Sequence, residues 1–102
     1  MTKVYDLEQR TFKFAMDCRV FCRSIFKDIP NREGTKQLVR SSGSVAANYI
    51  EVNESFSKKD FIFRVKVCRK EAKESTLWLR LIEVTDPELY AIRMTLVSET
   101  EE

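Results

Sequence analysis

The three cysteines, Cys18, Cys22 and Cys68, are the residues of this chain best suited to bind a metal or act as nucleophiles. Cys18 and Cys22 lie four residues apart, which places both thiols on one face of a helix. A structural zinc site usually takes four sulfur or nitrogen ligands, and the sequence has neither a fourth cysteine nor a histidine. We therefore expect three buried free thiols, which behave as small hydrophobic side chains, and no metal.

Three glutamates, Glu51, Glu71 and Glu74, form the other group that could hold a metal ion. Di-iron helical bundles combine such glutamates with Glu-x-x-His motifs, which a chain without histidine lacks. We expect these carboxylates to pair with Arg40, with Arg69 or with basic groups of a neighbouring subunit. The sequence shows no glycine-rich phosphate loop and no nucleophile–base pair. It predicts a non-enzymatic protein with no cofactor and no identifiable small-molecule substrate.

Basic side chains recur at helical spacing in three segments, of which the one over residues 32–40 holds Arg32, Lys36 and Arg40. Residues three or four apart on a helix share a face. The candidate nucleic-acid contacts are Arg19, Arg23, Lys27, Lys59, Lys66, Lys70 and Lys73. Such stripes bind phosphates without reading bases. The net charge is only +2, so an ordinary solvated helix surface explains the same pattern.

The elements that position these residues are predicted from apolar side chains at i, i+3/i+4 and i+7. This spacing indicates four helices, over residues 6–28, 32–56, 58–85 and 86 to about 98. The short connections favour an all-α, antiparallel up-down-up-down four-helix bundle. At 102 residues the chain has room for one domain, residues 1–102.

Helix ends are indicated by capping residues and prolines. Ile29-Pro30-Asn31 is expected to end the first helix, with Asn31 capping the second. Ser57 is the expected cap of the third helix. Asp86-Pro87, a cap followed by proline at the first helical position, begins the fourth.

The predicted core stripes account for only part of each helix surface. They are Leu7, Phe14, Cys18, Phe21, Ile25 and Ile29, then Leu38, Val45, Tyr49, Val52 and Phe56, then Phe61, Val65, Cys68, Ala72 and Leu79. The helix over 58–85 has a second apolar arc, and the helix over 32–56 has a polar seam at heptad spacing. We predict a homo-oligomer in which these two surfaces, as a polar helix–helix contact or a channel lining, form the interface. The candidate interface residues are Gln37, Ser41, Ser44, Asn48, Glu51, Val67, Glu71, Glu74 and Trp78.

Two segments resemble signatures of a known family, the bacterial four-helix-bundle proteins named after reading frames in 23S ribosomal RNA intervening sequences. The second-helix signature corresponds to Gln37-Leu38-Val39-Arg40 followed by Ser44-Val45-Ala46-Ala47-Asn48-Tyr49-Ile50-Glu51. The third-helix signature corresponds to Lys70-Glu71-Ala72-Lys73-Glu74-Ser75 and Leu77-Trp78-Leu79-Arg80. The opening Tyr5-Asp6-Leu7-Glu8 also fits.

The resemblance implies a ring-like homopentamer without enzymatic activity and of largely uncharacterised role. It also implies similarity to the accessory proteins of diversity-generating retroelements, which are basic pentamers that bind nucleic acid. We therefore expect sequence-nonspecific binding of RNA or DNA, with a protein-interaction scaffold as the alternative. No apolar run is long enough for a membrane span, and unpaired cysteines are typical of the reducing cytoplasm.

Overall fold

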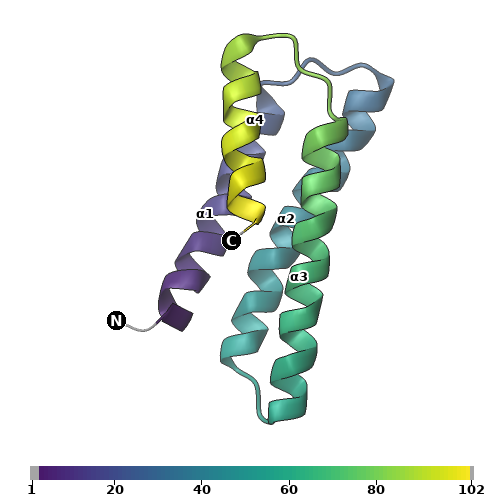
Figure 1. The fold of residues 1–102 in the computed structure, drawn as a ribbon. Helices are drawn as coiled ribbons and strands as arrows, with labels where there is room; N and C mark the ends of the chain where they lie inside the picture. The colour runs from purple at the N-terminus through teal and green to yellow at the C-terminus, as the bar shows by residue number, and fades with distance from the viewer. Residues whose placement is uncertain (1–2, 102) are drawn as a thin grey trace.

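The computed structural model describes residues 3–101 and consists of four helices joined by short connections. Their bounds are α1 (Lys3–Arg23), α2 (Ile29–Asn53), α3 (Lys58–Leu81) and α4 (Pro87–Thr100). The chain runs along the bundle in one direction through α1, returns through α2, and repeats this with α3 and α4 (Figure 1). The predicted all-α four-helix fold is confirmed. None of these helices, within residues 3–101, combines the length and apolar character that a bilayer span needs.

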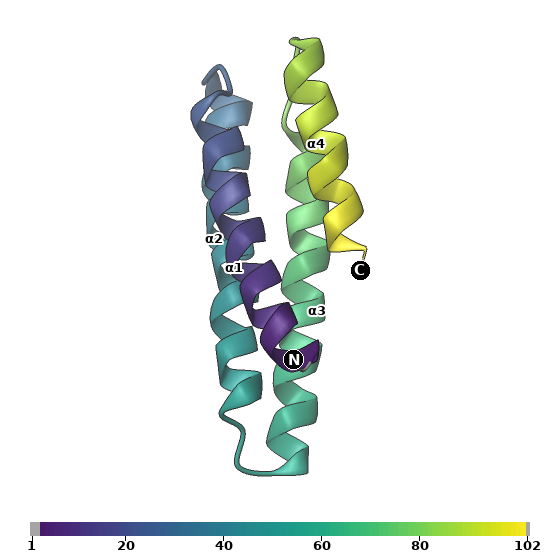
Figure 2. The ribbon, with the colours of Figure 1, turned by 90° about the vertical axis from the view of Figure 1, so that its left-hand side faces the viewer.

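The helices occupy four corners of the bundle, and each packs against two others. α1 and α3 both contact α2 and α4, so α1 lies diagonally across from α3. Figure 2 shows α2 beside α1 and α4 beside α3. Because each helix turns its buried stripe towards the bundle axis, the outer faces of α1 and α3 point in opposite directions.

The first connection differs from the prediction. α1 ends at Arg23 rather than Asp28, and Asp28 is the N-cap of α2, where its carboxylate accepts a hydrogen bond from the backbone N–H of Asn31. Proline is well tolerated in the first turn of a helix, where its missing N–H costs nothing. Ile29-Pro30 therefore begins α2 instead of ending α1, and Asn31 is not the cap.

Asn31 instead joins two loops. Its side-chain amide donates to the carbonyls of Phe26 (3.1 Å) and Glu83 (2.9 Å), and its Oδ1 accepts the N–H of Glu83 (2.9 Å). These bonds tie the α1–α2 connection to the end of α3. The expected caps of the other two helices are confirmed, since Ser57 caps α3 and Asp86 caps α4, with Pro87 following it.

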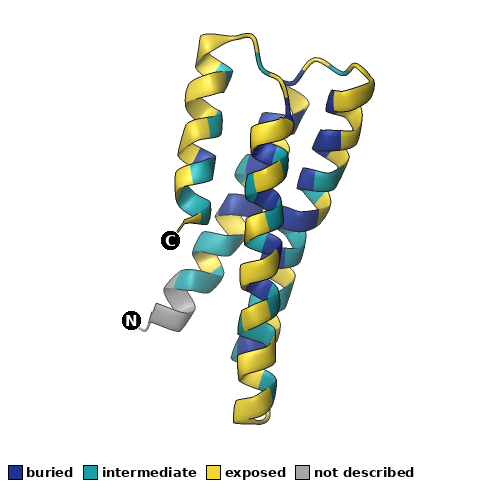
Figure 3. Ribbon diagram, turned by 45° about the vertical axis from the view of Figure 1, so that its right-hand side comes forward, coloured by how far each residue is buried: buried dark blue, intermediate teal, exposed yellow. Residues whose placement is uncertain are grey.

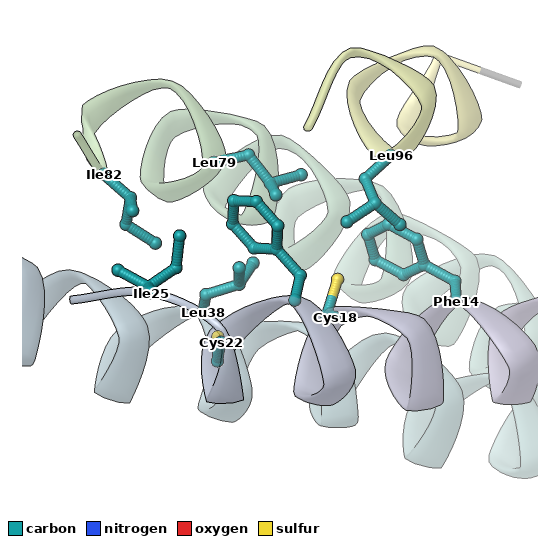
Figure 4. Close-up of a cluster of buried hydrophobic side chains, with 9 residues drawn as sticks. Phe14, Cys18, Cys22, Ile25, Leu38, Leu79, Ile82 and Leu96 are labelled. Atoms are coloured by element: carbon teal, nitrogen blue, oxygen red, sulfur yellow. The ribbon is translucent and has the colours of Figure 1, made fainter. Parts of the chain in front are cut away.

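The core lies where all four helices meet (Figure 4). It contains Phe14, Cys18, Phe21, Cys22, Ile25, Leu38, Leu79, Ile82 and Leu96. Three residues of the predicted stripes are exposed instead: Ile29, Phe56 and Phe61. Ile29 is the first residue of α2 and Phe56 lies in the turn after it, so helical periodicity does not place either side chain. Phe61 is in the first turn of α3, beyond the reach of α4.

α4 is the least buried helix among the described residues. Only its Leu96 is fully buried, while Leu89 and Val97 pack partly against the core. Its last turn is held by Arg10, which donates to the carboxylate of Glu99 at 2.9 Å. The hydroxyl oxygens of Thr76 and Thr100 lie 2.6 Å apart beside it. The end of α4 therefore lies beside the last third of α3.

Candidate nucleic-acid and subunit interfaces

The outer face of α3 is a basic stripe. It consists of the exposed side chains Lys59, Lys66, Arg69, Lys70, Lys73 and Arg80. Figure 3 shows the helix with its exposed residues turned away from the other three helices. Among the side chains that the structure describes, an acidic group comes within ion-pair distance of only Lys70 in this stripe, at 3.9 Å from Glu74. The predicted set Lys59, Lys66, Lys70 and Lys73 thus shares one accessible face.

The basic residues of α1 do not extend this stripe. Arg19 and Arg23 are exposed, but on the corner of the bundle diagonal to α3. Lys27 has a local role, because its Nζ donates to the carbonyls of Cys22 and Ile25 at 2.6 Å each and so caps the end of α1. In one subunit, Arg19 and Arg23 therefore lie on the opposite side from the α3 stripe.

The polar seam of α2 faces α3 of the same chain. The hydroxyls of Ser41 and Ser75 lie 2.8 Å apart and both side chains are fully buried. Asn48 accepts a hydrogen bond from Arg64 of α3 at 3.3 Å. Ser41 therefore makes a polar contact between helices of one chain, and a contact of this seam with a second chain stays a prediction.

The expected partners of the glutamates are confirmed for two of the three. Arg40 donates to Glu74 at 2.6 Å and to Glu71 at 3.3 Å. Glu71 is buried and Arg40 is half exposed, so the arginine compensates a carboxylate at the edge of the core. Glu51 is exposed, and a subunit contact there stays a prediction.

The remaining interface candidates lie at or near the surface. Gln37, Ser44 and Val67 are half-buried. Trp78 is also half-buried and packs against the core cluster. Their contribution to a subunit contact stays a prediction, since their surroundings in one chain fit either a packed or an interfacial role.

An apolar surface outside the predicted interface lies on the outer side of α1 and α2. Phe12, Met16 and Val20 are 64%, 50% and 55% exposed, and Ile50 of α2 is 49% exposed. Phe12 and Ile50 line a groove of about 440 Å³ between the two helices. We call these four residues the α1–α2 face. Its sequence signal is the i, i+4 spacing of Phe12, Met16 and Val20 opposite the core stripe.

The three cysteines are buried and unpaired. Burial raises the pKa of Cys18 to about 12 and that of Cys22 to about 11. These thiols therefore stay protonated at neutral pH, and thiols are neither good nucleophiles nor good metal ligands in that form. Among the described residues, no three side chains of the types that bind metals come together.

Both the sequence and the fold are similar to those of known proteins. A family model described as 23S rRNA-intervening sequence protein matches residues 3–87. A crystal structure of a protein of unknown function from the S23 ribosomal protein family of Bacteroides thetaiotaomicron superposes with a TM-score of 0.73. The two sequences are 22% identical, and the match covers 98% of this chain and 96% of that one. No protein of curated function matches the chain.

Proposed function

Because the chain belongs to the 23S rRNA-intervening sequence protein family, we propose that it is the non-enzymatic subunit of a ring-shaped homo-oligomer, with five subunits as the sequence resemblance implies. In this proposal the ring binds the phosphate backbone of RNA or DNA in the cytoplasm, without base readout. The antiparallel up-down-up-down bundle is the rigid unit that holds the contacting side chains.

The observation that carries the proposal is the unpaired charge on the outer face of α3. Surface lysines and arginines of helical proteins commonly pair with acids three or four residues away. In the part of the chain that the structure describes, no such pair involves the exposed α3 residues Lys59, Lys66, Arg69, Lys73 and Arg80. Lysines in the first turn of α3 also oppose the positive end of the helix dipole. Phosphates bound to this face would supply the missing acidic partners and would offset the unfavourable interaction of the first-turn lysines with the helix dipole.

The support for an oligomer is the α1–α2 face. A monomeric protein rarely exposes neighbouring large apolar side chains, and such patches commonly mark contacts between proteins. Within this face, α1 lies diagonally across from α3, whereas α2 packs directly on α3. A subunit contact centred on the α1 side chains of this face would leave the basic stripe accessible.

The experiment is a salt titration of binding to fluorescent single-stranded RNA and double-stranded DNA of unrelated sequences. We expect affinities that vary little with sequence and fall linearly with log salt concentration. Lys66→Glu with Lys70→Glu should weaken binding to all probes and lower the slope by about 2, one for each phosphate contact. Light scattering should show the same particle mass for this variant as for the wild type.

The matched control is Arg32→Glu with Lys36→Glu on α2, since both side chains are exposed and the net charge changes equally. This variant should bind nearly as well as the wild type if α3 carries the site. Equal loss in both variants would mean that binding follows total charge rather than this face. An absence of binding at low salt, even at tens of micromolar protein, where non-specific complexes form, would leave the scaffold as the function.

A further inference from the structure

A groove lies between α1 and α3 below the end of α4. Its volume is about 530 Å³, and its lining comes from α1, α2, α3 and the last residues of α4. The last described turn of α4 lies beside Thr76, and among the described residues the preceding part of α3 has no fourth helix next to it. The groove is the uncovered continuation of the fourth corner of the bundle.

The floor of the groove is apolar. Phe14 of α1 and Val45 of α2 are buried beneath it, and Val65 and Ala72 of α3 form one wall. Higher in the bundle, α4 covers the corresponding corner with Leu89, Leu96 and Val97. In the groove, no helix of the described residues covers the corresponding apolar surface.

The rim of the groove is basic on the α3 side. Arg69 and Lys73 line it, both are exposed, and neither has an acidic partner in the described residues. On the opposite wall, Arg10 binds Glu99 of α4. The pair between Glu99 and Arg10 is thus an example of a helix at this corner binding a cation of the groove wall through a carboxylate.

We propose that this groove binds an amphipathic acidic helix of a partner protein. The helix lies in line with α4, places apolar side chains on the floor of Phe14 and Val45 and against Ala72 of the α3 wall, and directs carboxylates at the basic rim. This is helix-in-groove recognition, in which anchors at i, i+3/i+4 and i+7 provide the contact. The occupant completes the fourth corner as α4 does above it.

The shape of the groove favours a helix over a small amphiphile. The groove is bounded by two diagonal helices and α2, it is open on its outer side, and one end is formed by the end of α4. Small-molecule sites usually enclose most of the ligand surface. An open trough with helical walls instead matches the space that a helix occupies in a four-helix bundle.

The test uses the full-length protein and a fluorescent synthetic peptide of about four helical turns. The peptide has leucines on one helical stripe and glutamates on both flanks of that stripe. Fluorescence anisotropy at physiological salt should show saturable binding below about 100 μM. A peptide of the same composition with the leucines scattered, and one with lysines in place of glutamates, should bind at least about tenfold more weakly.

Two variants and one matched control locate the site. Arg69→Glu with Lys73→Glu should weaken binding of the acidic peptide about tenfold. Ala72→Phe, which fills the groove from its α3 wall and leaves the charges intact, should weaken binding similarly, and circular dichroism should confirm that the bundle is folded. Lys66→Glu with Lys70→Glu changes the same charge on the same helix outside the groove, and it should weaken binding clearly less than Arg69→Glu with Lys73→Glu because neither side chain lines the groove.

Several results would overturn the proposal. The first is equal binding of the scattered peptide, which would show attraction to charge alone. The second is peptide binding that Ala72→Phe leaves unchanged. Saturable binding of decanoate, but not of the peptide, would make the occupant a small amphiphile, and a fall in the particle mass of Ala72→Phe would make it a second copy of this chain. The assay contains no nucleic acid, so its failure leaves the function proposed for the α3 stripe unaffected.

Discussion

The thiol of Cys18 links burial to the pH dependence of stability. The folded protein holds its pKa at about 12, against 9.0 for an accessible thiol, chiefly because burial disfavours the thiolate. A group whose pKa is raised on folding stabilises the fold below its unfolded pKa. That contribution is lost as the pH rises from 9 towards 12.

We therefore expect the free energy of unfolding of the wild type to fall more steeply above pH 9 than that of Cys18→Ala. The difference in slope should approach about 1.4 kcal/mol per pH unit. Urea denaturation at several pH values between 7 and 10.5 measures it. The small cavity left by the substitution lowers the free energy of unfolding at every pH, so only the slopes of the two curves against pH are compared. Parallel curves would contradict the burial of this thiol.

Residue-level contacts differ in how far the sequence predicts them. The pairing of Arg40 with Glu71 and Glu74 could be inferred, because opposite charges on neighbouring helices of a small bundle have few other partners. The role of Asn31 could not. Its bonds to Glu83 join residues 52 positions apart, and they depend on how two loops meet. As a sequence feature, an asparagine beside a proline indicates only a cap.

At the scale of elements, two glycines of α2 show opposite packing constraints. A Cβ added to Gly34 would lie 2.8 Å from Cγ1 of Ile82, which is buried in the core. At Gly43 the nearest atom is Nη1 of Arg19, 3.8 Å away, at the tip of a flexible exposed side chain. Alanine is therefore accommodated at one position and not at the other.

Gly43→Ala should stabilise the protein by about 0.5–1 kcal/mol, because alanine has the higher helix propensity. Gly34→Ala gains the same propensity but overpacks the core, and should destabilise the protein by about 1 kcal/mol net. Urea unfolding of both variants provides the measurement, each serving as the control for the other. Stabilisation by both substitutions would show that Ile82 repacks freely.

The two prolines explain why the start of α4 was predicted correctly, whereas the end of α1 and the start of α2 were not. Asp86-Pro87 combines a capping residue with proline at the first helical position, so a cap and first turn were the simplest interpretation, and α4 begins there. Pro30 follows an apolar stripe that continues in helical register up to Ile29, which favoured one long first helix. The chain instead turns after Arg23, where Lys27 satisfies the last carbonyls, and the periodicity through Ile25 and Ile29 spans two elements.

At the scale of the whole molecule, the α1–α2 face is the surface expected to bring subunits together. Phe12→Ser with Met16→Ser removes two of its apolar side chains without touching the core. Light scattering at micromolar concentration should give a mass well above 12.0 kDa for the wild type and a lower mass for this variant.

The matched control is Tyr90→Ser with Met94→Ser, because these α4 side chains are also apolar, exposed and one helical turn apart. Its mass should equal that of the wild type. A wild-type particle of 12.0 kDa would remove the oligomer from the proposed function. Loss of mass in the control alone would move the subunit contact to α4.

If the proposed function holds, the diagonal placement of α1 and α3 would make nucleic-acid binding depend on the protein concentration. A single basic stripe holds a nucleic acid weakly, whereas linked stripes bind with an overall affinity that exceeds that of one by about 10²–10⁴. Subunits joined at one corner add their stripes at the opposite corner without competing for the same surface. The concentration at which the ring assembles would then also be the concentration at which RNA or DNA is retained, so that synthesis of the protein, rather than any ligand, switches binding on.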